Sequence, residues 1–488
     1  NDSLGTIAKS GSIEFLEKIK NKDIKDIDIN IIGQFGVGFY SAFMVAKQVE
    51  VRTRSLYDNK AYLFTSAGAE TYEVSEIDKT SSGTEVILFL RENTDDFEYD
   101  QFLDEWKLKN LVKKYSDYVR YPIKMNVHKS VPVEGKKDKY EEVVEVETLN
   151  SMTPIWKKPK NEVNEEELNE FYKQKYYDYE DPLLNIQLKV EGAMEYTALL
   201  YIPKKAPYNL YSEKYEKGLQ LYSKGVFIME KCKELLPDYL RFVKGLVDSS
   251  DLSLNISREI LQKSKQLSDI AKNVEKRILS RLENLLKNDY DKYVEFFKVF
   301  GVNLKFGIYD DFGLKKESLQ DLIIYNTVNQ DKMITLKEYV AGMKEKQKFI
   351  YYASGKTKAS IMALPQMDLI KKEGYDVLML SDDVDEFALN ILQEYDKKPF
   401  KSINKGDLEL LDKKEEKKLK SLQEQKKPLL DKIKEALKDE VSDVVLSKRL
   451  TDSAVCLVST EALSFEMEKV IAHMPNEEKP KAERILEI

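Results

Sequence analysis

Three glycines within six residues give the strongest chemical signal in this sequence. They lie in the string Gly33-Gln34-Phe35-Gly36-Val37-Gly38-Phe39-Tyr40-Ser41, ahead of an apolar run. Residues without a Cβ atom let backbone amides approach an anion closely, and the amino end of a following helix favours phosphate. Because isolated glycine motifs are weak signals, a tight turn without a ligand is an equally good interpretation of this string alone. Its G-x-x-G-x-G order reverses the dinucleotide fingerprint, which disfavours a Rossmann enzyme.

Two further segments have residue types that could form chemical sites. Gly355-Lys356-Thr357 imitates the end of a phosphate-binding P-loop, but Ile350 stands where the full motif needs glycine, so we predict an ordinary turn. The segment 251–262 contains Arg258, and Ser257 is placed to cap a helix that starts near it. On periodicity alone, Arg258 is a surface arginine in a weak ion pair.

Cysteine and histidine are too scarce for several kinds of site. The only cysteines are Cys232 and Cys456, and the only histidines are His128 and His473. Their separation excludes a disulfide framework and a cysteine-rich zinc site. It also disfavours a histidine metal site and a Ser-His-Asp triad. We therefore predict no metal ligand among the residues of this sequence.

The size and charge of the chain narrow the function further. Its 488 residues suggest about three domains. Lys and Arg number 78 against 86 Asp and Glu, a net charge of −8, which argues against a nucleic-acid partner. The sequence shows neither a signal peptide nor an apolar run of membrane-spanning length. A cytoplasmic protein without stable membrane association is expected.

The elements around the glycine string predict a mixed α and β unit over residues 1–129. Ala42-Phe43-Met44-Val45-Ala46 is typical of a buried helix. Residues 49–53 alternate between apolar and charged or polar, as in a half-exposed strand, and residues 85–90 predict a second strand. Residues 130–147 are charged and poor in apolar side chains, and we interpret them as a solvated linker.

A middle segment over 148–400 contains both kinds of periodicity. Strands are predicted at 186–190 and 199–202, and helices at 235–246 and 274–285. A smaller α/β part follows over about 295–400. Its two apolar runs and the helix between them, over residues 349–380, predict a βαβ unit.

The last segment, 401–488, is rich in charge. Lys413-Lys414-Glu415-Glu416-Lys417-Lys418 is typical of a solvated helix face. Amphipathic helices are predicted at 429–437 and 463–471. The whole chain is therefore predicted to be of the α/β (α+β) class.

Several long strings of this sequence closely resemble the heat-shock protein 90 family of chaperones. Together they cover essentially the whole chain, which makes the resemblance specific. The short connector at 130–147 is more similar to bacterial members than to the eukaryotic cytosolic form. The strings are Leu4–Gly11, Gly33–Ser41, Tyr118–Ile123, Leu200–Pro203, Gly225–Met229, Leu240–Leu252 and Asn255–Glu259.

The resemblance implies an ATP-driven dimeric clamp. Its first part would be the remainder of a GHKL-type ATPase sandwich with a lid at about 5–36, followed by the middle domain. The partial, mostly helical α/β C-terminal domain would come last. In that family the catalytic loop would be 251–262, where Arg258 reaches the terminal phosphate with Asn255 and Gln262 nearby. The resemblance assigns nucleotide binding to Lys9, Ser10, Gly33, Gln34, Phe35, Gly36, Val37, Gly38, Phe39 and Thr84.

The sequence departs from the family pattern at several points. Ser253 stands where the family commonly has proline, and Ser3 where an asparagine contact is common. The family's general-base Glu, its adenine-reading Asp and its Mg²⁺-binding Asn precede the lid and have no match here. The family's dimer helices lie beyond residue 488. We therefore expect homodimerisation in the intact protein, and ATP and Mg²⁺ as its cofactors, with the Mg²⁺ ligand outside this chain.

Two functions follow as expectations. The first is an ATP-dependent chaperone that binds unfolded or partly folded client proteins. The second, for these 488 residues alone, is a client-binding module without ATPase activity. A histidine kinase or a topoisomerase-like ATPase of the same superfamily is disfavoured, because neither His128 nor His473 has a phospho-acceptor context and the acidic balance opposes DNA binding.

Overall fold

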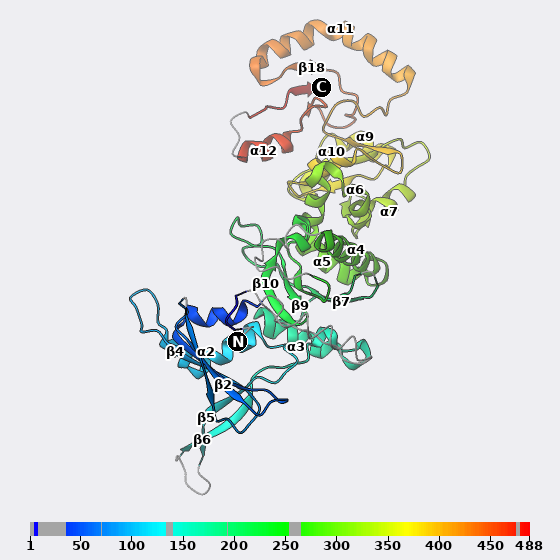
Figure 1. The fold of residues 1–488 in the computed structure, drawn as a ribbon. Helices are drawn as coiled ribbons and strands as arrows, with labels where there is room; N and C mark the ends of the chain where they lie inside the picture. The colour runs from blue at the N-terminus through cyan, green and yellow to red at the C-terminus, as the bar shows by residue number, and fades with distance from the viewer. Residues whose placement is uncertain are drawn as a thin grey trace.

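The computed structural model describes residues 4–7, 36–69, 71–132, 140–192, 194–252, 265–474 and 479–488. Within these residues, four sheets of three or more strands follow one another along an elongated chain (Figure 1). Helices lie beside or between them. The predicted α/β class is confirmed.

The first sheet is antiparallel with strand order β3-β2-β1-β4. Its strands are β1 (Ala46–Arg54), β2 (Ala61–Ser66), β3 (Tyr72–Ile77) and β4 (Gly83–Leu90). Both strands predicted here are confirmed, and Val49 and Val51 are buried. The predicted buried helix over 42–46 is wrong: a 3-10 helix, η1 (Gly38–Met44), ends there without a fully buried residue. Since β1 begins at Ala46, only a short helical segment fits before the sheet.

The segment interpreted as a linker instead forms the two arms of a hairpin. It follows α2 (Glu105–Tyr115) and consists of β5 (Lys124–Pro132) and β6 (Tyr140–Thr148), paired antiparallel. Residues 133–139 lie outside the described part. Val144 and Val146 alternate with acidic residues in β6, yet both valines are exposed, so neither face of this strand is buried. The prediction that this segment is exposed to solvent is correct for β6, whose residues are mostly exposed. The pairing of β6 with β5 was not predicted.

The second sheet forms the centre of the molecule, with strand order β10-β9-β11-β8-β7. The strands predicted at 186–190 and 199–202 are confirmed as parts of β7 and β8. The helix predicted at 274–285 is confirmed within α4, whose apolar face packs into the largest core. The elements here are α3 (Glu165–Tyr176), β7 (Leu184–Val190), β8 (Tyr196–Ile202), β9 (Leu219–Ser223), β10 (Val226–Cys232), β11 (Lys244–Ser249), α4 (Lys265–Asn288) and α5 (Tyr290–Tyr309).

The helix predicted at 235–246 is wrong. Two 3-10 turns, η5 (Lys233–Leu235) and η6 (Asp238–Leu240), precede strand β11. Pro237 lies between the turns, and β11 must extend in order to pair with β8 and β9. Because these residues are buried on every side, their spacing resembles a helix stripe by coincidence.

The third sheet has the order β13-β12-β15-β14-β17-β16. The predicted βαβ unit is confirmed, since β14 and β15 are parallel with two helices between them. Thr357 caps the first of these helices, so Gly355-Lys356-Thr357 is a turn ending in a helix cap. The elements are α6 (Lys316–Leu319), β12 (Ile324–Thr327), β13 (Ile334–Thr335), α7 (Leu336–Ala341), β14 (Ile350–Ser354), α8 (Lys358–Met362), α9 (Met367–Glu373), β15 (Leu378–Leu380), α10 (Asp385–Leu392), β16 (Glu394–Tyr395) and β17 (Lys398–Ser402).

The last sheet has three strands in the order β18-β20-β19. The charged run at 413–418 is the exposed start of a helix that also contains the apolar residues predicted at 429–437. The second predicted helix is confirmed as α12. The elements are α11 (Lys413–Leu437), β18 (Asp443–Val445), β19 (Cys456–Ser459), α12 (Phe465–His473) and β20 (Arg484–Glu487).

Candidate functional site

The glycine turn leads directly into the first sheet. Gly36 has φ +64°, in the left-handed region that favours glycine. The Tyr40 N–H donates to the Val37 carbonyl at 3.1 Å, and no side chain caps the helix at Val37. A Cβ atom at Gly38 would meet no atom within 4 Å, so this side of the turn is open. An anion could approach the first helical amides here, because they have no partner within a helix.

Aromatic rings hold the turn on one face of the sheet. The Phe39 ring lies edge-on to Phe43 and Phe64, with centroids 5.9 and 6.0 Å away. It packs beside the buried Val49 and Val51 of β1. Ring packing of this kind orients the backbone of the turn as well as burying apolar surface.

Thr84 lies on the same face of the first sheet as the aromatic cluster. It stands opposite Thr53 in β1, and the two hydroxyl oxygens are 2.8 Å apart. Thr53 follows Val49 and Val51 at intervals of two residues, so all three point to one side of β1. The fold therefore brings the glycine turn and Thr84 to one face, 46 to 48 residues apart in sequence.

Eight of the predicted site residues lie outside the described residues, and their roles remain predictions: Lys9, Ser10, Gly33, Gln34, Phe35, Asn255, Arg258 and Gln262. The structure does describe both attachments of the segment 253–264. It follows β11, a strand inside the second sheet, and precedes α4. The Asp251 carboxylate accepts the Glu195 N–H at 2.6 Å, which fixes the chain just before the segment.

A buried carboxylate close to this attachment was not found from the sequence. Asp248 in β11 accepts the indole N–H of Trp156 at 3.1 Å and the Gly225 N–H at 3.2 Å. The Lys157 ammonium lies 2.8 Å from the same carboxylate. The Tyr118 ring, from the chain after α2, lies 4.5 Å from the Trp156 ring. Asp248 thus holds Trp156, which touches Tyr118, on the strand that leads into the segment 253–264. The sequence signal for this contact was a single acidic residue, Asp248, directly after the apolar residues Leu246 and Val247.

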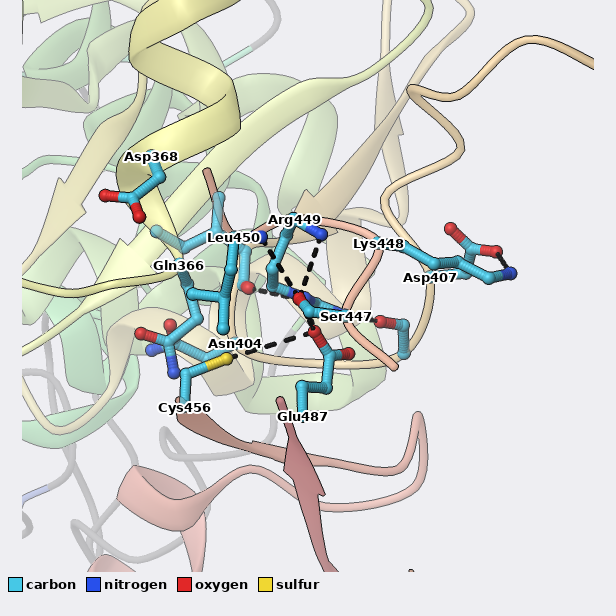
Figure 2. Close-up of polar contacts among 12 residues, drawn as sticks. Gln366, Asp368, Asn404, Asp407, Ser447, Lys448, Arg449, Leu450, Cys456 and Glu487 are labelled. Atoms are coloured by element: carbon cyan, nitrogen blue, oxygen red, sulfur yellow. Dashed lines mark hydrogen bonds and ion pairs between the residues drawn. The ribbon is translucent and has the colours of Figure 1, made fainter. Parts of the chain in front are cut away.

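A second buried charge was also missed. Arg449 is 1% exposed, and its Nε donates to the Glu487 carboxylate at 2.9 Å. Its other nitrogens donate to the carbonyls of Ile403, at 2.6 Å, and Gly406. Figure 2 shows the Glu487 carboxylate directed at both Arg449 and Cys456. Burial and this carboxylate raise the pKa of the Cys456 thiol to about 12, so the thiol stays protonated at neutral pH.

The loop that contains Arg449, between β18 and β19, also contacts α9, one of the two helices between β14 and β15. The Leu369 N–H, in α9, donates to the Arg449 carbonyl at 3.1 Å. The Asp368 carboxylate, in the same helix, accepts the N–H groups of Asp452 and Ser453 at 3.3 and 3.0 Å. Although partial burial opposes it, these amides lower the pKa of Asp368. α9 and the last part of the chain are therefore hydrogen-bonded together.

Neither metal binding nor a membrane span is indicated in the part of the chain that the structure describes. No three His, Cys, Asp or Glu side chains there are grouped so that they could hold a metal ion. No described helix combines the length and the apolar character needed to cross a membrane.

Comparison with known proteins gives one consistent family. The family described as Hsp90 protein matches residues 101–144 and 133–488. "Chaperone protein HtpG" of Alkaliphilus metalliredigens is 50% identical over 487 residues, which cover 100% of this chain and 77% of that protein. The proteins of the same name from Clostridium perfringens and Bacillus subtilis are 48% identical over 488 and 485 residues, again 77% of their length.

These matches run through every sheet described above. The resemblance seen in the glycine string and around residues 240–259 therefore extends over the whole sequence. The chain belongs to the Hsp90 protein family.

Proposed function

We propose that this protein is an ATP-dependent molecular chaperone that works as a dimeric clamp on partly folded client proteins. The observation that carries the proposal is the match of the whole chain to chaperone proteins at 48–50% identity. The open glycine turn and Thr84, on one face of the first sheet, support a nucleotide site there. We place the working protein in the cytoplasm, as a homodimer.

ATP fits the glycine turn as a substrate. The backbone amides from Gly36 to Phe39 would hold its phosphates, since the left-handed Gly36 and the open side at Gly38 leave room for an anion. For Mg²⁺, the family's ligand Asn has no match in this sequence, and the described residues contain no group of three or more His, Cys, Asp or Glu that could hold a metal ion. No step of the proposal is therefore assigned to the ion.

Arg258 is proposed to stabilise the charge that develops on the departing phosphoryl group. Arginine suits this role because its planar guanidinium binds oxyanions with two N–H groups. The segment that carries it is attached to β11 and α4 of the second sheet. Hydrolysis would then require the second sheet's part to dock on the nucleotide part, so that turnover reports closure of the clamp.

Arg258→Ala tests this role. Turnover of ATP should fall on the order of 100-fold, the scale of losing one transition-state donor, while the dissociation constant for ATP changes little. Arg258→Lys should recover only part of the rate, because an ammonium cannot form the bidentate contact. The protein for this test must carry the family's complete nucleotide domain. Equal losses of turnover and ATP binding would contradict the role.

The second candidate concerns the 488 residues by themselves. We propose that they bind client proteins without hydrolysing ATP, because the general base that the family uses has no match in this sequence. Calorimetry with ATP and a fluorescence assay with an unfolded protein would separate the two activities. Client binding without heat from ATP is expected. Tight ATP binding by these residues alone would contradict this candidate.

A further inference from the structure

A groove of about 390 Å³ lies beside the edge of the second sheet. One wall is the chain at the start of α3, and the other is formed by α4 and the start of α5. Figure 1 shows β7 between α3 and the α4–α5 pair. Of the predicted site residues that the structure describes, none lines this groove.

The edge strand β7 forms the floor of the groove. β7 has β8 on one side and, within the described residues, no strand on the other. Five consecutive residues, 183–187, line the groove. Successive side chains of a strand point to opposite faces, so a groove that touches all five follows the backbone edge. Unpaired N–H and C=O groups on such an edge are a template for one more strand.

The walls of the groove are strongly basic. Lys160, Arg277, Arg281 and Lys292 line it, against the single acid Glu165. Within the described residues none of these four basic side chains forms an ion pair, although the chain as a whole carries a net charge of −8. The one polar contact found for Arg281 is a long hydrogen bond to Asn284 at 3.4 Å. Positive charge is therefore concentrated where the sheet edge is open.

The spacing of the two arginines matches an extended peptide. Arg277 and Arg281 are four residues apart on α4, so their Cβ atoms are about 6 Å apart. Alternate residues of a strand are separated by about 6.7 Å. Two acids at alternate positions of an added strand could therefore each meet one arginine. The residues between them would point to the opposite wall, toward Val163 and Leu168 at the start of α3.

We propose that this groove binds an extended acidic segment of another polypeptide, which adds a strand to β7. The backbone edge would supply affinity for any extended chain, and the basic walls would select acids at every second position. This interaction surface is separate from the glycine turn and requires no nucleotide.

A labelled ten-residue peptide with Glu alternating with Val and Thr provides the probe. Its binding to the full chain is followed by fluorescence anisotropy at low and moderate salt. We expect saturable binding that Arg277→Glu with Arg281→Glu weakens at least about tenfold, because like charges then face the peptide. The matched control is Lys272→Glu with Lys276→Glu, the same charge change on the same helix outside the groove, with less than about a twofold effect. Equal losses in both variants would overturn the proposal.

Peptides N-methylated at every second residue test strand addition without altering the protein. An added strand turns alternate N–H groups toward β7, so methylation of one set should weaken binding about tenfold and methylation of the other set should not. Equal affinity for both peptides would show charge attraction alone and overturn the proposal. Binding of a single-stranded RNA of equal charge, with the same dependence on Arg277 and Arg281 and tighter than the peptide, would also overturn it.

Discussion

At the scale of the residue, the described structure matches its buried charges with specific partners. Asp248 accepts N–H groups from Trp156 and Gly225 and pairs with Lys157. Arg449 donates to one carboxylate and two carbonyls. A buried charge without such partners is very costly, so these residues hold particular segments together and are poor candidates for binding a ligand.

An exposed pair gives a pH-dependent prediction. Hydrogen bonding to Glu105 raises the pKa of His128 above 6.5, and hydrogen bonding to His128 lowers the pKa of Glu105 below 4.5. The stabilisation is present where the imidazole is charged and the carboxylate ionised, and it is lost as pH rises through the raised pKa of His128. Glu105→Gln should therefore lower the free energy of unfolding at about pH 6 but have little effect at about pH 8.5. Urea unfolding at both values, with a ¹H NMR titration of His128, checks this.

The control for that prediction is Glu145→Gln. Glu145 pairs with Lys129, the residue after His128, at 3.0 Å. The lysine remains charged throughout this pH range, so any effect of the control should not change between the two conditions. If Glu105→Gln leaves the pKa of His128 unchanged, or if its effect on stability does not depend on pH, then the pair of His128 and Glu105 does not stabilise the protein as proposed.

At the scale of the element, pairing decided the structure where local patterns were ambiguous. The residues at 235–246 are spaced as a helix stripe, yet they form 3-10 turns and the start of β11. β11 lies between β8 and β9, so both of its edges gain hydrogen bonds by extension. In α4 the residues of the apolar stripe are the ones that are buried, so periodicity predicted this helix correctly.

Gly245 provides a test of this packing. It has φ +149°, and a Cβ atom would overlap the Leu199 carbonyl oxygen and lie 2.8 Å from the Leu200 Cα atom. Both neighbours are backbone atoms of β8 and cannot move aside. Gly245→Ala should destabilise the protein by about 3 kcal/mol, through backbone strain and steric overlap. The midpoint of urea unfolding measures this.

The matched control is Gly342→Ala, after α7. A Cβ atom there would make ordinary contacts of 3.5 and 3.6 Å, and its φ is −89°. The change should alter stability by less than about 1 kcal/mol. Similar effects of the two substitutions would show that the close approach of β11 to β8 is not the cause.

At the scale of the whole molecule, the sheets are joined by a few polar contacts between distant segments. Asp248 connects the chain after β6, at Trp156, to the second sheet, and Asp368 connects α9 to the loop before β19. Arg449 closes the last part by reaching both the chain after β17 and Glu487 in β20. A large movement of one part relative to the next would break these contacts. We expect them to be preserved when the proposed clamp closes.

Arg449→Ala should lower the stability of the C-terminal part by about 3–5 kcal/mol, because it leaves Glu487 buried and unpaired. The combination of Arg449→Met with Glu487→Leu should recover much of this loss. Lys434→Ala is the control, since Lys434 forms an exposed pair with Asp443 in the same part and should cost less than about 1 kcal/mol. Urea unfolding and limited proteolysis report the transition. If Arg449→Ala lowers stability no more than Lys434→Ala does, the buried pair of Arg449 and Glu487 does not stabilise the C-terminal part.

The sequence by itself determined the elements with a clear period, such as β1, α4 and the βαβ unit from β14 to β15, and it indicated the family. Local periodicity suffices there because the same few residues both form the element and bury its apolar face. Of the candidate site, the glycine turn was predicted, and its place beside Thr84 follows from the register of β1 with β4. Only the tertiary structure decided the partners of Asp248 and Arg449 and the basic groove at β7. Trp156 and Asp248 are 92 positions apart, and no spacing along the chain specifies contacts that long-range strand order creates.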